Sequence, residues 1–315
     1  MFDSALTLKS AEMYYYHRLS QKDIAAKLGL SVPTVSRMLN DALVSGMIKV
    51  EIVDKERHID ELEEKMATRF ELQGATVISL SPSANPASLK KLLGKAASSI
   101  LYDQVKPGHL VGMGPGETML ELVESLDPGR TLPGLTLLPL MGGWGFGGMA
   151  YEVNRLLGNA ANSLRCDFNL MPCPALTSSE EVREIFLREP IIAEIAAKWE
   201  RLDMALVSIG GEVDDAHYPQ LASGNATSLA QAKRSGAVGD ILGRFIGAEG
   251  SELDLEINRR FVSIPAETLA RVPLRIGIGG GSAKIRSIRA SLKRGLINYL
   301  VSDESTCGTI LQMED

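Results

Sequence analysis

The feature that most constrains this chain is a pair of short capped helices joined by a tight turn. Ser20 and Ser31 are suited to begin helices, because a serine hydroxyl accepts a hydrogen bond from an N–H of the first turn. Gly29 lies where a left-handed residue can end the first helix. Pro33 falls in the first turn of the second, where its missing N–H costs little. The pattern predicts helices over 5–19, 21–28 and 32–44, with a short strand over 47–53.

Residue size favours a helix-turn-helix within this segment. Ala25 is small where the second helix would cross the third, and Ile24, Leu28, Leu30, Val35 and Met38 can form a three-helix core. The N-terminal part of the third helix is then exposed, which is the part that a recognition helix presents to the major groove. Arg37 can contact guanine or phosphate, and Gln21 is a candidate phosphate anchor. The predicted DNA-binding residues are Gln21, Ser31, Pro33, Thr34, Ser36, Arg37 and Asn40. A plain three-helix bundle is the alternative.

From residue 75 onward, short β-rich runs alternate with helical stretches, which indicates a mainly parallel sheet covered on both faces. The chain is therefore predicted as α/β, with an N-terminal three-helix domain over 1–54 and a large domain over 74–315. Residues 55–73 are predicted as an amphipathic helix, which is either a linker or oligomerisation helix or packs onto the large domain. Strands are expected over 75–80, 110–114, 135–141, 204–209, 275–278 and 299–302. Helices are expected over 86–105, 118–126, 151–157, 179–201, 228–235 and 283–294.

Glycine-rich turns of the large domain point to an anionic ligand. The turn at Gly112-Met113-Gly114-Pro115-Gly116-Glu117-Thr118 runs from a strand to a helix, where backbone N–H groups can approach an anion. Glu117 stands where a dinucleotide fingerprint needs glycine, and a Walker lysine is missing. A phosphate or a sugar hydroxyl group is thus favoured over NAD or ATP.

Three further segments are candidate ligand contacts. Lys284 follows Gly279-Gly280-Gly281 at a predicted helix N-terminus and can meet a phosphate, although a solvated lysine is the alternative. Asp240, after Gly236 and Gly239, can accept hydrogen bonds from sugar hydroxyls or can cap a helix. The aromatic loop over 141–148 can be a lid or a solvent loop.

Composition and charge are those of a reduced, cytosolic protein. The 315 residues carry a net charge of −6, but residues 1–52 hold six basic and five acidic side chains, so the head carries +1 and the body −7. No apolar run approaches the ~20 residues of a membrane span. Cys166, Cys173 and Cys307 are widely spaced and are expected to be buried thiols. No metal ligands, cofactor or membrane partner are predicted.

The chain resembles the SorC family of sugar-responsive transcriptional regulators. The resemblance is carried by Tyr14-Tyr15, by Leu19-Ser20-Gln21 and Ile24-Ala25, and by the segment from Ser31 to Arg37. It continues in Gly236-Ala237-Val238-Gly239-Asp240, in Gly279-Gly280-Gly281 with Lys284, and in Leu300-Val301-Ser302-Asp303-Glu304. Pro33 and Cys307 depart from the family pattern, and Pro33 leaves the DNA sequence preference open.

The resemblance implies an effector domain akin to the ribose-5-phosphate isomerase and glucosamine-6-phosphate deaminase fold, in a homodimer or homotetramer bound to double-stranded operator DNA. It implies that Gly114, Gly116 and Thr118 lie at a phosphate end with Lys284, that Asp240 faces sugar hydroxyls, and that Gly142 and Gly143 line the pocket.

Three functions compete at this point. The leading one is a DNA-binding regulator whose sugar or sugar-phosphate effector changes operator affinity. The second is a sugar-phosphate isomerase or deaminase with a DNA-binding appendage, for which Asp240 and Glu117 are the candidate bases. The third is a constitutive DNA-binding protein with a vestigial pocket.

Overall fold

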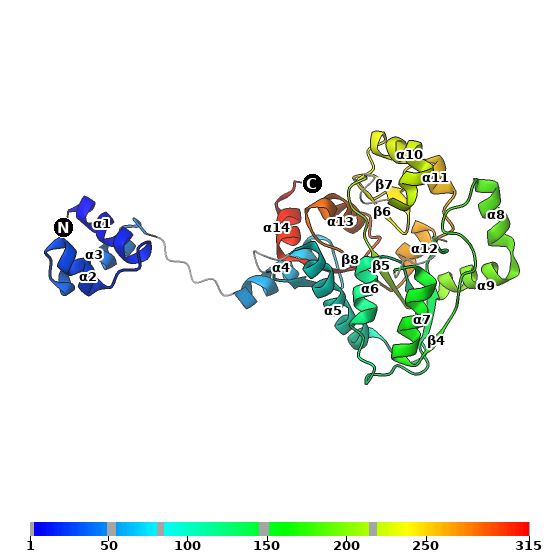
Figure 1. The fold of residues 1–315 in the computed structure, drawn as a ribbon, viewed down its shortest axis with the longest axis horizontal. Coiled ribbons are helices and arrows are strands. Elements are labelled where there is room, and N and C mark those ends of the chain that lie inside the picture. The colour runs from blue at the N-terminus through cyan, green and yellow to red at the C-terminus, as the bar shows by residue number, and fades with distance from the viewer. Residues whose placement is uncertain (1–2, 49–54, 81–84, 145–150, 214–218, 315) are drawn as a thin grey trace. The chain divides into compact units, whose positions relative to one another are not determined.

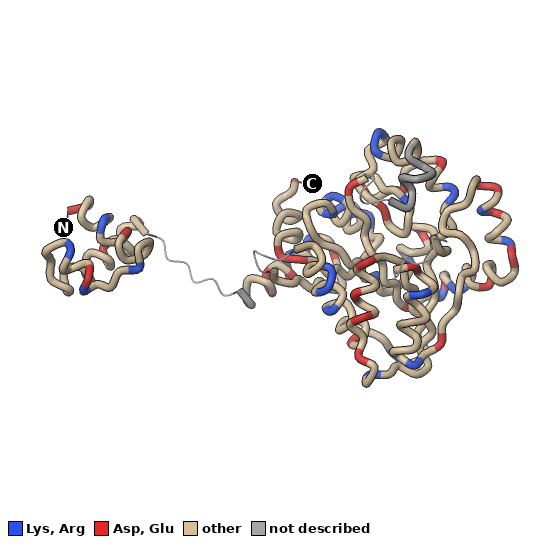
Figure 2. The backbone as a smooth tube through the Cα atoms, viewed as in Figure 1, with Lys and Arg blue, Asp and Glu red and all other residues tan. Residues whose placement is uncertain are grey.

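The computed structural model describes residues 3–48, 55–80, 85–144, 151–213 and 219–314. The chain forms two compact units, Met1–Lys55 and Glu56–Asp315 (Figure 1). Acidic and basic residues are interspersed along the tube of each unit (Figure 2).

The first unit is a bundle of three helices, α1 (Ser4–Tyr15), α2 (Gln21–Leu28) and α3 (Val32–Val44). Ile24, Val35 and Ala42 are fully buried between them, and Leu28 and Leu30 are partly buried against the same core. Ala25 is also buried, as its small size predicted. The structure thus confirms the predicted three-helix core.

Each predicted helix signal of this unit has a visible counterpart. The Ser20 hydroxyl accepts from the Asp23 N–H at 3.2 Å, and the Ser31 hydroxyl accepts from the Thr34 N–H at 3.3 Å. Gly29 ends α2 with a φ of 67°. The first helix is shorter than predicted, because the chain turns after Tyr15 and Arg18 adopts a left-handed φ of 52°. Most of the predicted strand over 47–53 lies outside the described residues.

The second unit is built on a parallel seven-stranded sheet, which confirms the predicted α/β class. The order is β1-β9-β8-β5-β2-β3-β4. A separate antiparallel hairpin pairs β6 with β7. The strands are β1 (Gly74–Ile78), β2 (Leu110–Met113), β3 (Thr136–Pro139), β4 (Asp167–Phe168), β5 (Met204–Ser208), β6 (Gly239–Ile241), β7 (Arg244–Ile246), β8 (Leu274–Ile278) and β9 (Tyr299–Asp303).

Helices cover both faces of this sheet. Along β5, Met204 and Leu206 join one buried cluster with α5, α6 and α7, whereas Ala205 and Val207 join the other. This alternation is what a sheet buried on both sides requires. The helices of the unit are α4 (Lys55–Arg69), α5 (Pro86–Gln104), α6 (Glu117–Glu124), α7 (Val153–Leu164), α8 (Glu180–Arg188), α9 (Pro190–Lys198), α10 (Pro219–Arg234), α11 (Glu256–Arg259), α12 (Ala266–Arg271), α13 (Ile285–Lys293) and α14 (Glu304–Gln312), with 3₁₀ turns at Trp199–Arg201 and Ser282–Lys284.

Several element predictions are corrected by the structure. The single helix predicted over 179–201 is two helices, because Pro190 cannot donate the hydrogen bond that would continue α8 and instead begins α9. The helix predicted over 228–235 begins earlier, at Pro219. The prediction did not include β4, β6, β7, α11, α12 or α14.

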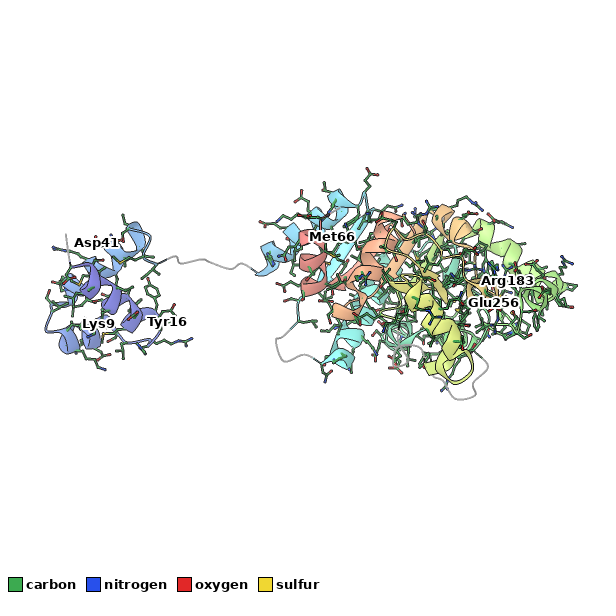
Figure 3. The ribbon with its side chains drawn as sticks, turned by 90° about the horizontal axis from the view of Figure 1, so that it is seen from above. Lys9, Tyr16, Asp41, Met66, Arg183 and Glu256 are labelled. Carbon is green, nitrogen blue, oxygen red and sulfur yellow. The ribbon has the colours of Figure 1, made fainter. Side chains whose placement is uncertain are left out.

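The helix α4 packs onto the second unit. Leu62 and Met66 on one side of it are buried in the core of this unit, and Figure 3 labels Met66 within this packed region. Arg69 donates to the carbonyls of Ile310 and Leu311 on α14, at 3.2 and 2.9 Å. Packing onto the large domain, one of the two predicted roles of this helix, is therefore observed.

The strand order makes the chain connections diverge at the neighbouring strands β2 and β5. After β2 the chain continues to β3 on one side, and after β5 it continues to β8 on the other, so the connections diverge. In open α/β sheets, ligands bind where such connections part at the carboxyl ends of the strands. Among the described helices, none has the length and apolar character needed to cross a membrane.

Candidate functional site

A cavity of about 720 Å³ opens at this divergence. Its walls come from the turns that follow β2, β5 and β8, together with the first turn of α5 and the β6–β7 hairpin. Of the predicted effector-binding residues, it brings together Gly116, Glu117, Thr118, Asp240 and Lys284.

The turn after β2 presents the N-terminus of α6 to the cavity. Gly116 precedes the helix with a φ of 129°, a conformation that side chains rarely adopt, and no side chain of the described residues caps the helix. The N–H groups of its first turn therefore remain available to an anion. The buried Ser208 hydroxyl faces the same turn, since a Cβ on Gly116 would lie 3.0 Å from its oxygen. This hydroxyl has no hydrogen-bond partner among the described residues.

The turn after β8 brings Lys284 to the opposite wall. Lys284 is half-buried, and desolvation lowers the pKa of its amine to about 8, although the negative charge of Asp240 acts in the opposite direction. Lys90 further lowers this pKa, and Glu117 raises it. Lys284 lines the cavity, and its contact with a phosphate stays a prediction. A partly desolvated ammonium attracts an anion more strongly than a fully exposed one does, because less water screens it.

Asp240 lies on the strand β6 and not at the start of a described helix. Its carboxylate accepts from the Gly243 N–H at 2.7 Å, within the β6–β7 turn. The turn carries Leu242 at a φ of 52° and Gly243 at 84°. Asp240 is thus held on a rigid hairpin beside the cavity.

Three of the predicted glycines lie behind the cavity rather than in its lining. A Cβ on Gly114 would lie 2.6 Å from the side chain of Leu242, and one on Gly142 would lie 2.5 Å from the carbonyl of Pro174. Gly143 exchanges backbone hydrogen bonds with Cys173 and Ala175. These glycines permit close backbone packing, and their neighbours Met141 and Trp144 line the cavity instead. Residues 145–150 of the predicted lid loop lie outside the described residues.

The sequence interpretation missed several lining residues. Lys90 on α5 forms an ion pair with Glu117 on α6, and Ser208 ends β5. These residues belong to no glycine-rich motif and are distant along the chain. Asn85 is the N-cap of α5, and this capping pattern could have predicted where the helix begins. It could not have predicted that the start of the helix lies beside the cavity. The missed lining residues include Asn85, Lys90, Tyr151 and Ser208, whereas Trp144 and Ser282 lie within segments that were predicted as candidate ligand contacts.

In the first unit, most predicted DNA-binding residues form an exposed surface at the start of α3. Ser31, Pro33, Ser36, Arg37 and Asn40 are exposed, whereas Gln21 and Thr34 are half-buried. The Thr34 hydroxyl lies 2.8 Å from that of Ser31, so both take part in the helix cap.

Comparisons with protein families match both units. Residues 54–312 match the family described as "Putative sugar-binding domain", and residues 17–49 match the family described as winged helix-turn-helix DNA-binding. Among curated relatives, the transcriptional regulator LsrR of Enterobacter sp. (strain 638) is 31% identical over 314 residues, covering 99% of this chain and 94% of the relative. LsrR of Escherichia coli (strain K12 / DH10B) is 29% identical over 315 residues, covering 99% and 96%.

Solved structures agree with these matches. The full-length sorbitol operon regulator SorC from Klebsiella pneumoniae superposes with a TM-score of 0.76 at 26% identity, over 99% of this chain and all of that one. A transcriptional regulator from Streptococcus pneumoniae TIGR4 has the same fold, with a TM-score of 0.75 at 20% identity over 82% and 98% of the two chains. These relatives are transcriptional regulators and not enzymes, so the isomerase or deaminase alternative has no support. The chain belongs to the SorC family of sugar-responsive transcriptional regulators.

Proposed function

We propose that this regulator controls an operon for the catabolism of a carbohydrate or polyol, and that a sugar or sugar phosphate in the 720 Å³ cavity sets its operator affinity. The observation that carries the proposal is the meeting of Lys284, Asp240 and the uncapped α6 N-terminus in one cavity. An ammonium and free helix N–H groups suit a phosphate, and a carboxylate suits sugar hydroxyls.

The proposed effector site consists of Gly116, Glu117, Thr118, Asp240 and Lys284, together with Lys90 and Ser208, which line the same cavity. Glu117 and Lys90 are both substantially exposed, so their ion pair contributes little stability. A phosphate can therefore replace Glu117 as the partner of Lys90 at small cost. Gly114, Gly142 and Gly143 support the walls through backbone packing.

DNA is bound by the start of α3 in the major groove of the operator. Arg37 and Asn40 read base edges, Ser36 contacts a base or the backbone, and Gln21 anchors a phosphate. Ser31, Pro33 and Thr34 shape the helix N-terminus, whose N–H groups face the DNA backbone. The whole is a cytoplasmic homodimer or homotetramer, in which α4 contributes to association and effector binding changes the spacing of the heads.

A thermal-shift screen tests the effector assignment. Phosphorylated and free sugars and polyols are added to the full-length protein, and a ligand that binds only the folded state raises the melting temperature. Trp144 lines the cavity and provides a second signal, because its fluorescence should change on occupation and this change should vanish in Trp144→Phe. A screen without any stabilising compound would favour the vestigial-pocket alternative.

Operator binding then tests the regulatory step. Operator fragments are selected from random DNA by the ligand-free protein, and their affinity is measured with and without each stabilising sugar. The proposal expects at least one sugar phosphate to change the dissociation constant. A constant affinity across all stabilising compounds would overturn it.

A further inference from the structure

The turn after β8, which forms one wall of the cavity, is hydrogen-bonded to the buried carboxylate of Asp303. The Gly281 N–H donates to Asp303 Oδ2 at 2.9 Å and to Thr306 Oγ1 at 2.8 Å. Gly280 lies directly on the same carboxylate, since a Cβ there would lie 2.3 Å from Asp303 Oδ2. Gly280, Gly281 and Ser282 all line the effector cavity, whereas Asp303 does not.

Asp303 is at the same time the N-cap of α14. Its Oδ1 accepts from the Thr306 N–H at 3.0 Å, and its Oδ2 accepts from the Thr306 hydroxyl at 2.6 Å. Both residues are buried, with exposed fractions of 2% and 1%. A buried carboxylate with several donors holds a fixed position, because moving away from any of them leaves a buried polar group unpaired. The glycine turn and α14 therefore share one anchor.

The other side of α14 is attached to α4 at both ends. At the start of α14, Glu304 Oε1 lies 3.4 Å from His58 Nε2 on α4, and Glu304 Oε2 accepts from the Ser79 hydroxyl at 3.0 Å. At its end, Arg69 of α4 donates to the carbonyls of Ile310 and Leu311. Asp303, Glu304 and His58 also line a second cavity of about 490 Å³ between the two helices. From α4 the chain continues toward the DNA-binding unit.

We infer that Asp303 is a positioning residue of this regulator: its carboxylate sets the position of the cavity turn Gly280–Ser282 and, through α14, ties that turn to His58 on α4. The inference rests on the proposed function in taking the cavity as the effector site. A ligand that displaces the turn then moves Asp303 and, with it, the N-terminus of α14. That movement changes the contact between Glu304 and His58. Such a chain of hydrogen-bonded groups couples the two sites only if a change at the cavity turn and a change at α4 favour the same arrangement of the groups between them.

Hydrogen exchange in the ligand-free, full-length protein tests the link without knowledge of the effector. Asp303→Asn keeps one acceptor for the Thr306 N–H but replaces the carboxylate oxygen at the Gly281 N–H with an amide donor, which leaves Thr306 Oγ1 as the acceptor of that N–H. Exchange over 279–285 should rise roughly tenfold or more, as expected for the loss of a hydrogen bond to a charged group. Thr306→Val should raise exchange less, because Asp303 still accepts from Gly281, and Thr306→Ser should restore the native rate.

The long-range arm uses Glu304→Gln, which touches neither the cavity turn nor its hydrogen bonds. The inference expects faster exchange both over 58–66 of α4 and over 279–285 of the turn. Glu64→Gln removes the same charge from an exposed position of α4 and should change neither segment. If Asp303→Asn fails to fold, Glu304→Gln and His58→Gln still carry this arm.

If Glu304→Gln changes hydrogen exchange only in the first turn of α14, the inference is overturned. The contact between Glu304 and His58 would then have no effect on the cavity turn. A sugar screen without ligands would overturn the proposed function and leave this exchange result unaffected. When the screen yields a ligand, the Glu304→Gln variant should bind that ligand with an affinity within about twofold of the native protein. In the variant, the ligand should change the affinity for the operator much less than it does in the native protein.

Discussion

At the scale of single residues, the structure changes what Lys284 can do. A glycine run followed by lysine suggests a phosphate contact, but a sequence cannot distinguish a solvated ammonium from a buried one. The structure places this half-buried lysine in a cavity wall near Asp240, Lys90 and Glu117, and desolvation lowers the pKa of its amine to about 8. The position of an ionisable group relative to other chain segments decides its pKa, and those segments are distant in sequence.

Lys284→Met should weaken the binding of a phosphorylated sugar by at least tenfold and leave operator binding in the absence of effector unchanged. The thioether fills the volume of the lysine stem without its charge. Calorimetric titration with the best compound from the screen measures the loss. An unchanged affinity would remove Lys284 from the effector site, and the unphosphorylated sugar is the matched control, since its binding should respond less.

The affinity for an anionic effector should fall as the pH rises through about 8. The Lys284 amine loses its charge there in the free protein, whereas a bound anion stabilises the charged form and raises the pKa. For folding the sign is opposite: the folded pKa lies below the usual 10.5, so the stability of the ligand-free protein gains from this group as the pH rises from about 8 toward 10.5. Titrations from pH 7 to 9 measure the first effect, and Lys284→Met should flatten the profile.

Arg37→Ala should cost about 1–3 kcal/mol at the specific operator and relax the preference at one base pair, if the exposed guanidinium reads a base. Binding to a set of single-base operator variants measures this. Arg18→Ala, an exposed arginine outside α3, is the charge-matched control. A loss of equal size on unrelated DNA would assign Arg37 to the phosphate backbone instead.

At the scale of elements, local signals predicted well wherever the reason for an element is local. Caps at Ser20 and Ser31 and the left-handed Gly29 fix the helices of the first unit, because their hydrogen bonds close within four residues. The predicted strands of the large domain were confirmed because their signal is also local. A strand that is buried on both faces is a short run of apolar residues. The helix over 179–201 was wrong, because its apolar pattern outweighed Pro190. The two-residue strand β4 has no periodicity to detect and exists only through its pairing with β3.

Gly29→Ala tests the helix-turn-helix at this scale. A Cβ at Gly29 meets nothing within 4 Å, so the whole cost of the change is the left-handed φ of 67°. The first unit should lose about 1–2 kcal/mol of stability. Hydrogen exchange of the α2 and α3 amides measures the loss, and operator affinity should fall with it.

Gly308→Ala is the matched control. This glycine lies inside α14, has an ordinary helical φ and also has open space around its Cβ position. Alanine there should stabilise the second unit by about 0.5–1 kcal/mol. A destabilisation at Gly308, or none at Gly29, would show that the backbone conformation is not the deciding factor.

At the scale of the whole molecule, a small head with a charge of +1 is joined to a body with a charge of −7. Phosphate contacts supply most non-specific affinity for DNA, so a head with few basic residues binds weakly alone. Under the proposed function, specific binding depends on two or more heads that contact the same operator. The body contains the proposed effector cavity, and we propose that it sets the spacing of the heads.

The spacing of operator half-sites tests this dependence. Two heads related by symmetry contact sites that repeat with the DNA turn of about 10 base pairs. Inserting about five base pairs between half-sites should reduce affinity by tenfold or more, and inserting about ten should restore most of it. Gel-shift titrations measure both. Equal affinity for all three spacings would mean that each head binds independently.

Local sequence patterns were sufficient to predict the helix-turn-helix, the α/β class of the body and three of the turns around the cavity. Each depends on residues that are neighbours in the chain, so size, capping and glycine positions are sufficient. Which of these turns meet depends on the packing of the folded chain. The divergence of the connections between β2 and β5 brings Lys90, Ser208, Asp240 and Lys284 to one cavity and places Gly142 behind it. Strand order arises from packing between distant segments, and the pKa of Lys284 follows from that packing.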